Sequence, residues 1–233
     1  MVCGLLEVIA SFSPTSAFSN VDLPELGRPT IDTRPDRNAT SLILADGGAS
    51  SGRPARVYAA GVEIRQADRQ DWPAIWPIFA AVVAAGDSYA FPDPMDSADA
   101  RALWMEGPPA RTVVAVENGE VLGTAKMGPN RPGRGAHVAT ASFMVDPGRQ
   151  RRGVGRRLGE HVLQWAAATG YRSMQFNAVV ETNTAAVALW RSLGFEVVGT
   201  VPEAFDHARD GLVGLHVMYR RLEPPGRPEP DSV

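Results

Sequence analysis

The sequence predicts a mixed α/β fold, with helices on both faces of one mostly antiparallel sheet. Strand and helix patterns follow the order β-α-α-β-β-β-α-β-α-β-β, in which a three-strand meander precedes a βαβαβ unit. Asn118 and Gly119 join two β-branched runs, and both residues tolerate the positive φ of a tight hairpin turn. Residues 61–222 are long enough for one hydrophobic core, so we expect a single domain over that range.

Caps and helix breakers define the elements of the first half. A short strand is expected over 61–67. A helix follows over 71–86, with Asp68 as its N-cap and Gly86 at its end, and Pro77 is expected to split or kink it. The remaining elements of this half are a helix over 96–107 and strands over 111–117, 120–128 and 137–145.

The second half alternates helices and strands, which is the pattern of βαβ units. A helix is predicted over 148–170, because its apolar residues fall on one stripe and Gly170 closes it. The stripe consists of Val154, Leu158, Val162 and Trp165. The remaining elements are strands over 171–180, 195–201 and 212–222 and a helix over 182–194.

The two ends of the chain differ from this regular part. Residues 1–60 are rich in Ser, Pro, Gly, Thr and Arg and have no sustained periodicity, so we expect a disordered extension or a mispredicted start. The tail over 223–233 has a similar composition and is expected to be disordered.

The composition argues against several classes of function. The net charge is −3, whereas a nucleic-acid binder usually has a basic excess. The sequence has no apolar run of about 18 residues for a membrane span and no basic region for a signal peptide, so we expect a cytoplasmic protein that binds no membrane. One cysteine and four scattered histidines indicate no metal site. The sequence does not determine whether the protein forms a homodimer.

The stretch over 149–160 combines five arginines and three glycines at a strand-to-helix junction. A helix N-terminus presents unpaired N–H groups and a positive dipole end, and Gly153 and Gly155 let an anion approach the main chain. This arrangement suits a pyrophosphate. It is neither a Walker loop nor a GxGxxG motif, because no Gly-Lys-Ser/Thr follows and Arg156 and Arg157 come after the second glycine. An amphipathic helix with solvated arginines is the alternative.

Two motifs in this half carry a resemblance to a known family. The run QRRGVG over 150–155 matches the Q/R-x-x-G-x-G/A signature of the GNAT superfamily of N-acetyltransferases, and the block over 181–199 resembles its N-x-x-A-x-x-L-[YW]-x-x-x-G-F element. The resemblance spans 61–222 and implies acetyl-CoA as co-substrate, with its pyrophosphate held by the backbone of the first motif. The cofactor contacts that it implies there are Gln150, Arg151, Arg152, Gly153, Val154, Gly155 and Arg156.

The resemblance also implies that the sheet splays between its fourth and fifth strands. An extended pantetheine arm can satisfy the exposed backbone groups as an added strand does. We expect Met144 and Val145 to lie there, with an amide near Val145 polarising the thioester carbonyl. Asn183 is expected to contact the cofactor, to cap the following helix, or both. Trp190, also expected at the cofactor, stands where many family members have a tyrosine acid, so the sequence predicts no tyrosine acid at that position.

The acceptor side of the site is predicted from the fifth strand. Asn177 interrupts an otherwise apolar strand, which costs free energy unless its amide is paired, so it either bonds to a neighbour or contacts substrate. The segments over 128–145 and 175–199 resemble the GNAT branch that contains the proline-analogue (azetidine-2-carboxylate) acetyltransferases. That branch implies Asn130 and Asn177 as substrate contacts and a small amino-acid-like acceptor.

A proton acceptor is needed because the attacking amine must lose a proton. Glu181 lies just past the fifth strand and is the candidate, acting through water; His137 is another, and Glu181 as a solvated residue is the structural alternative. The segment over 202–211 is expected to form a loop over the acceptor pocket.

These observations predict an acetyl-CoA-dependent N-acetyltransferase that acts by direct attack in a ternary complex on a small amine or amino acid. The sequence leaves three alternatives. The chain could be a catalytically silent acyl-CoA-binding module, a nucleic-acid binder that uses the arginine cluster, or an enzyme whose acceptor is a protein N-terminus or an aminoglycoside.

Overall fold

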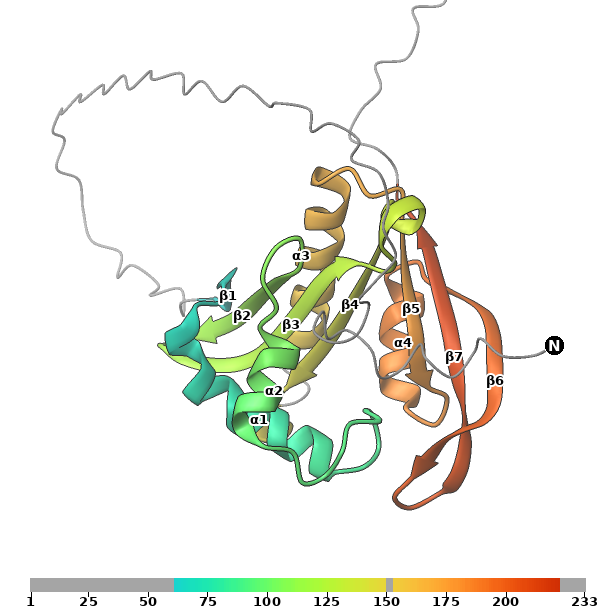
Figure 1. The fold of residues 1–233 in the computed structure, drawn as a ribbon, viewed down its shortest axis with the longest axis horizontal. Helices are drawn as coiled ribbons and strands as arrows, with labels where there is room; N and C mark the ends of the chain where they lie inside the picture. The colour runs from blue at the N-terminus through green and yellow to red at the C-terminus, as the bar shows by residue number, and fades with distance from the viewer. Residues whose placement is uncertain (1–60, 150–152, 223–233) are drawn as a thin grey trace, which may run out of the picture. The chain divides into compact units, whose positions relative to one another are not determined.

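The computed structural model describes residues 61–149 and 153–222, and the predicted order of strands and helices is confirmed there (Figure 1). The first half contains β1 (Glu63–Gln66), α1 (Trp72–Ala84), α2 (Ser97–Trp104), β2 (Arg111–Glu117), β3 (Glu120–Pro129) and β4 (Val138–Val145). The second half contains α3 (Val154–Ala168), β5 (Ser173–Val180), α4 (Thr184–Ser192), β6 (Glu196–His207) and β7 (Gly211–Arg221). The predictions for residues 1–60 and 223–233 lie outside the described residues.

One seven-stranded sheet runs through the described part in the order β1-β2-β3-β4-β5-β7-β6. Neighbouring strands are antiparallel except β4 and β5, which are parallel because the α3 crossover joins them. The prediction of a mixed, mostly antiparallel sheet is therefore confirmed. The β2–β3 hairpin turns at Asn118 and Gly119, whose φ angles are 52° and 81°.

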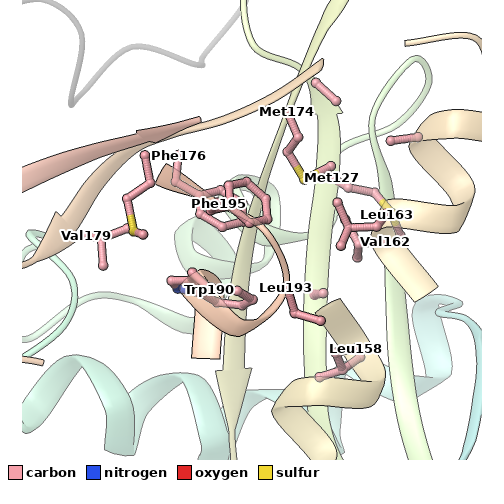
Figure 2. Close-up of a cluster of buried hydrophobic side chains, with 14 of the residues drawn as sticks. Met127, Leu158, Val162, Leu163, Met174, Phe176, Val179, Trp190, Leu193 and Phe195 are labelled. Carbon is pink, nitrogen blue, oxygen red and sulfur yellow. The ribbon is translucent and has the colours of Figure 1, made fainter. Parts of the chain in front are cut away.

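The helices cover both faces of this sheet, as the sequence predicts (Figure 1). Successive residues of a strand point to opposite faces, and β2 shows the division. Val113 and Ala115 pack into the core beneath α3 and α4, whereas Val114 packs into the core beneath α1 and α2. Figure 2 shows the first of these cores, in which Phe176 of β5 lies close to Trp190 of α4.

The sixth strand is longer than the sequence predicts. A loop is predicted over 202–211, but β6 continues to His207, which pairs with Gly211 of β7 across the turn. That prediction is therefore wrong. β6 is an edge strand, which tolerates Pro202 and the two register shifts in its pairing with β7. Most residues of β6 are exposed, so the alternation that marks a half-buried strand is absent from its sequence.

Two helices differ from their predicted form. α3 begins at Val154 rather than at residue 148, because Gly153 precedes it with a left-handed φ of 77° and a 3-10 turn occupies Pro147–Arg149. α1 is not split, and Pro77 lies inside a continuous helix. The later start places the N-terminus of α3 at Gly153, where the motif resemblance expects a pyrophosphate.

Candidate active site

The sheet opens between β4 and β5. These parallel strands pair near their N-terminal ends, at Val138 with Ser173 and at Ala139 with Met174. Beyond these two pairs the strands diverge, although β4 continues to Val145 (Figure 1). The predicted splay between the fourth and fifth strands is thus confirmed.

An aromatic cluster lies beneath the opening on the α4 side of the sheet. The buried ring of Trp190 lies 4.6 Å from that of Phe143 on β4 and 4.9 Å from that of Phe176 on β5, measured between centroids. Trp190 therefore packs against side chains of both strands that border the opening. Its indole has no acidic group to offer a leaving thiolate.

The backbone of β4 faces the opening at alternate residues. The Asp146 N–H donates to the Leu122 carbonyl of β3 (2.9 Å), so Met144, two residues earlier, also directs its backbone towards β3. Val145 and Phe143 then direct their N–H and C=O groups into the opening. Of the two residues predicted to line it, Val145 has this orientation, whereas Met144 turns its backbone away and buries its side chain in the core beneath α1.

The N-terminus of α3 lies beside the Val145 end of the opening. Gly153 occupies the N-cap without a side-chain hydrogen bond, so the first N–H groups of the helix have no side-chain cap. A Cβ on Gly155 would lie 3.8 Å from the Val145 side chain and 3.4 Å from that of Leu189, which places α3, β4 and α4 together here. Val154 between the glycines is buried in the core. The predicted contacts that lie outside the described residues are Gln150, Arg151 and Arg152.

The arginines at the start of α3 have partners within the protein. Arg156 donates to the Ser192 hydroxyl (2.7 Å) and lies 3.7 Å from the Glu160 carboxylate, and all three side chains are exposed. Arg157 donates to the Val62 carbonyl (3.1 Å). Arg156 therefore lies at the junction of α3 and α4, where its charge is accessible from solvent.

Three amide side chains form a hydrogen-bonded chain on the other face of β5. Gln175 donates through Nε2 to Asn177 Oδ1 (2.8 Å), and Asn177 donates through Nδ2 to Asn130 Oδ1 (2.6 Å). Met174 and Phe176 belong to the core beneath α3 and α4, so alternation places Gln175 and Asn177 on the side of α1 and α2. The structure thus brings together the two asparagines that the sequence predicts as acceptor contacts.

A β-bulge determines where Asn177 points. Phe176 pairs with Met218 of β7, and Val179 pairs with His216, so β5 carries one residue more than β7 between these pairs. A bulge bends the strand and redirects a side chain, and it leaves backbone groups outside the ladder. Asn177 therefore occupies an irregular position that a regular β5 would not provide.

Asn183 and Glu181 hold backbone groups at the C-terminal end of β5. Asn183 Oδ1 accepts the Ala186 N–H (3.1 Å), which confirms its capping role, and its Nδ2 lies 3.4 Å from Ser88 Oγ. Glu181 Oε1 accepts the Gly214 N–H of β7 (2.5 Å). The Glu181 carboxylate is thus anchored to β7 although the residue is exposed, and its role as proton acceptor stays a prediction.

Tyr89 is a site residue that the sequence pattern does not indicate. Its hydroxyl donates to the Phe143 carbonyl (2.7 Å) and accepts from the Phe143 N–H (2.8 Å), at the opening. Its ring stacks on Phe91 and lies edge-on to Trp104. Burial raises the pKa of the Tyr89 hydroxyl above its usual value, so the group stays protonated at neutral pH. No local signal reveals this contact, because its partner lies 54 residues away in the sequence.

Within the part of the chain that the structure describes, no group of three or more His, Cys, Asp or Glu side chains is placed to hold a metal ion. Over 61–149 and 153–222, no helix has the length and apolar character needed to cross a bilayer.

The chain matches the model of a known family. The model of the Acetyltransferase (GNAT) family matches residues 63–195, and the chain belongs to that family. The matched range runs from β1 to just past α4, so it includes the opening, the α3 N-terminus and the amide chain. The predicted membership of the superfamily is therefore confirmed.

Several named proteins are similar to the chain. The L-amino acid N-acyltransferase MnaT of Escherichia coli (strain K12) is 30% identical over 179 residues, which are 74% of this chain and 99% of that protein. The N-acetyltransferase aca1 of Schizosaccharomyces pombe is 36% identical over 84 residues, or 36% of this chain. The match covers 40% of aca1 and 13% of Protein SPT10 of Saccharomyces cerevisiae, so the chain spans less than half of these two fungal relatives.

Solved structures share the fold. A GCN5-related N-acetyltransferase from Kribbella flavida is 56% identical, with a TM-score of 0.68 over 70% of this chain and 98% of that one. The yncA protein of Salmonella typhimurium, solved with its cofactor acetyl-CoA, is 27% identical, with a TM-score of 0.60 over 73% of this chain and 99% of that one.

Proposed function

We propose that the protein transfers an acetyl group from acetyl-CoA to the amine of a small amino-acid-like acceptor, by direct attack in a ternary complex. The observation that carries the proposal is the hydrogen bond (2.6 Å) from Asn177 Nδ2, on the β5 strand that borders the opening, to Oδ1 of Asn130, which directly follows β3. The relative matched over nearly its whole length is named for transfer to L-amino acids, which supports this acceptor class. Within the family, the amide pair favours the branch with the azetidine-2-carboxylate acetyltransferases.

In this proposal acetyl-CoA, the acyl donor, lies along the opening between β4 and β5. The α3 N-terminus after Gly153 presents unpaired N–H groups to the pyrophosphate, and Arg156 adds positive charge nearby. Val145 directs its N–H into the opening, where it can polarise the thioester carbonyl and stabilise the developing oxyanion. Asn183 caps α4 through its oxygen, so its amide nitrogen can donate to the pantetheine arm. The thioester supplies an activated acyl carbon and a thiolate leaving group.

The acceptor is held by neutral donors. A carboxylate accepts several hydrogen bonds, and side-chain amides and backbone N–H groups can supply them. The chain from Gln175 through Asn177 to Asn130 fixes the orientation of each amide, so these donors are preorganised before the acceptor binds. The bulge also leaves backbone groups at Asn177 and Ala178 outside the ladder, where they can donate to the same carboxylate.

In this proposal, proton transfer from the acceptor amine and to the departing thiolate does not use a tyrosine acid at position 190. Glu181 follows β5 directly and takes, through water, one proton from the acceptor ammonium, which leaves the neutral amine that attacks. The Gly214 N–H occupies Oε1 of its carboxylate and leaves Oε2 to accept that proton. After attack the acceptor nitrogen is positively charged, and the departing thiolate takes its proton from this nitrogen or from water, because the Trp190 indole is not an acid.

The proposal is tested by incubating the full chain with acetyl-CoA and a panel of amino acids, amines and aminoglycosides. The expected result is CoA release with one or more amino acids and with no aminoglycoside. Saturable acetyl-CoA binding without turnover on any amine would overturn it in favour of a catalytically silent acyl-CoA-binding module. Turnover only with a peptide N-terminus or an aminoglycoside would keep the reaction and overturn the acceptor class.

A further inference from the structure

A pocket of about 280 Å³ lies at the end of β1 and the start of β2, away from the opening between β4 and β5. Its lining comes from these two strands, from the loop between α2 and β2 and from the last turns of α3. The strands β3 and β4 lie between β2 and the opening. Trp165, which lines the pocket, is about 16 Å along α3 from Val154 at the helix start. The pocket is therefore separate from the candidate active site.

The loop between α2 and β2 forms a preshaped wall of this pocket. The Ala110 N–H donates to the Gly107 carbonyl (3.1 Å) and closes a turn that contains Pro108 and Pro109. A proline ring fixes φ, so this wall keeps its shape before a ligand binds. The half-buried indole of Trp165 lines the pocket from α3. A ligand thus meets two apolar surfaces, one of prolines and one aromatic.

Arg111 gives the pocket an unmatched positive charge. In the described part of the chain, its exposed guanidinium has no hydrogen-bond acceptor and no carboxylate partner. Burial and the nearby Arg111 charge lower the pKa of the His161 imidazole, which places the guanidinium beside α3. Trp165 lies one turn further along the same face of α3. The carboxylate that lines the pocket belongs to Glu106, and it is already paired with the Lys126 ammonium at 3.1 Å.

We propose that this pocket binds a small carboxylate with a flat apolar body, such as an aromatic acid. A carboxylate can accept two parallel N–H bonds from a guanidinium, and the Arg111 guanidinium is free to donate them. The ring of the ligand then lies against the Trp165 indole and the two prolines, where its apolar surface is removed from water. The volume is close to the lower end of the range for small-molecule sites, roughly 300–1,000 Å³, which suits a ligand of one ring.

Binding of para-fluorobenzoate to the full chain, followed by the width of its fluorine NMR signal, tests this site. We expect saturable binding in the millimolar range, which this method can measure. Para-fluorobenzylamine has the same ring and the opposite charge, so it should not bind at the same concentrations. Arg111→Met keeps an apolar stem and removes the charge, so it should weaken the binding of para-fluorobenzoate about tenfold or more. Trp165→Leu should weaken it as well, because the aromatic surface is lost.

Arg191→Met removes an exposed arginine on α4 and is the matched control, which should bind para-fluorobenzoate as the wild type does. Saturating acetyl-CoA and the Asn177→Ala substitution both act at the opening, so neither should reduce the binding. If Arg111→Met does not fold, as judged by thermal unfolding, Trp165→Leu carries the test.

Four results would overturn the inference. These are absence of para-fluorobenzoate binding to the wild type, equal binding of para-fluorobenzylamine, unchanged affinity in folded Arg111 and Trp165 variants, and displacement of para-fluorobenzoate by acetyl-CoA. The last result would place the carboxylate at the opening instead. None of these measurements depends on acetyl transfer, so the inference and the proposed function can fail independently.

Discussion

Asn177 on β5 donates through Nδ2 to Oδ1 of Asn130, 47 residues earlier in the chain and 2.6 Å away. Gln175 donates in turn to Asn177, so these hydrogen bonds fix the orientation of all three side-chain amides. Asn130 is 4% exposed, and its own N–H donates to the Val138 carbonyl (2.7 Å), which holds it at the end of β3. A hydrogen-bonded amide pair between two strands is sensitive to loss of either member, because the remaining partner is left unpaired.

Asn177→Ala should therefore lower the activity towards the amino-acid acceptor without changing the affinity for acetyl-CoA. We expect kcat/KM for the amino-acid acceptor to fall by about 10- to 100-fold, since one hydrogen bond to a charged group contributes about 1.5–3 kcal/mol. The Kd of acetyl-CoA, measured by calorimetry, should not change. Gln164→Ala, at an exposed position on α3, is the control and should behave as the wild type. An equal loss of donor affinity would place Asn177 at the donor instead.

Gly155→Glu should abolish acetyl-CoA binding without unfolding the protein. A Cβ at this position would lie at ordinary contact distance from Leu189 and Val145, so the first side-chain carbon fits. A glutamate carboxylate beside the α3 N-terminus would, however, repel a pyrophosphate and occupy its path. Gly155→Ala is the matched control and should retain binding within about threefold. Unchanged affinity in Gly155→Glu, measured by calorimetry, would show that the pyrophosphate lies elsewhere.

The sequence predicts the features that depend on local rules. The Asn118-Gly119 turn, the Asn183 cap and the order of strands and helices each follow from a few neighbouring residues, and the structure confirms them. No local pattern encodes the contact of Asn130 with Asn177, and resemblance to a family branch predicts only that both residues contact the acceptor.

The features that escape prediction depend on distant partners or on edges. Tyr89 reaches the site through a contact with Phe143, 54 residues along the chain, and its own segment has no periodicity that signals burial. The extension of β6 to His207 depends on pairing with β7, since an exposed edge strand has no apolar alternation of its own. The backbone groups of Met144 and Val145 point in opposite directions. This difference depends on the register of β3 against β4, which is fixed only in the assembled sheet.

The ion pair of Arg65 with Asp71 should make stability depend on acid pH. Two guanidinium hydrogen bonds, at 2.7 and 2.8 Å, lower the pKa of the Asp71 carboxyl below its usual value of 3.8. The folded protein therefore favours the charged form, so the stabilisation is complete above the pKa of the unfolded chain and is lost as pH falls through the lower folded-state pKa. Asp71→Asn should lower the free energy of unfolding by about 1–3 kcal/mol near neutral pH.

Urea unfolding at about pH 7 and about pH 2.5 measures this effect. The difference between the wild type and Asp71→Asn should shrink at the lower pH, because the unfolded chain then binds a proton at Asp71 and the stabilisation by the charged carboxyl decreases. Asp99→Asn changes an exposed aspartate in the first turn of α2 and should show no comparable shrinkage. A difference that is the same at both pH values would mean that Asp71 acts through packing rather than charge.

Glu181→Gln separates the two roles of Glu181. A glutamine oxygen can still accept the Gly214 N–H, so the attachment of β5 to β7 and the thermal stability should persist. The amide cannot take a proton, so kcat should fall by about a hundredfold. Glu196→Gln, at the exposed start of β6, is the control and should leave kcat and the thermal stability unchanged. If kcat of Glu181→Gln matches the wild type while Glu181→Ala is destabilised, the carboxylate serves only to hold Gly214, and the ammonium loses its proton directly to water.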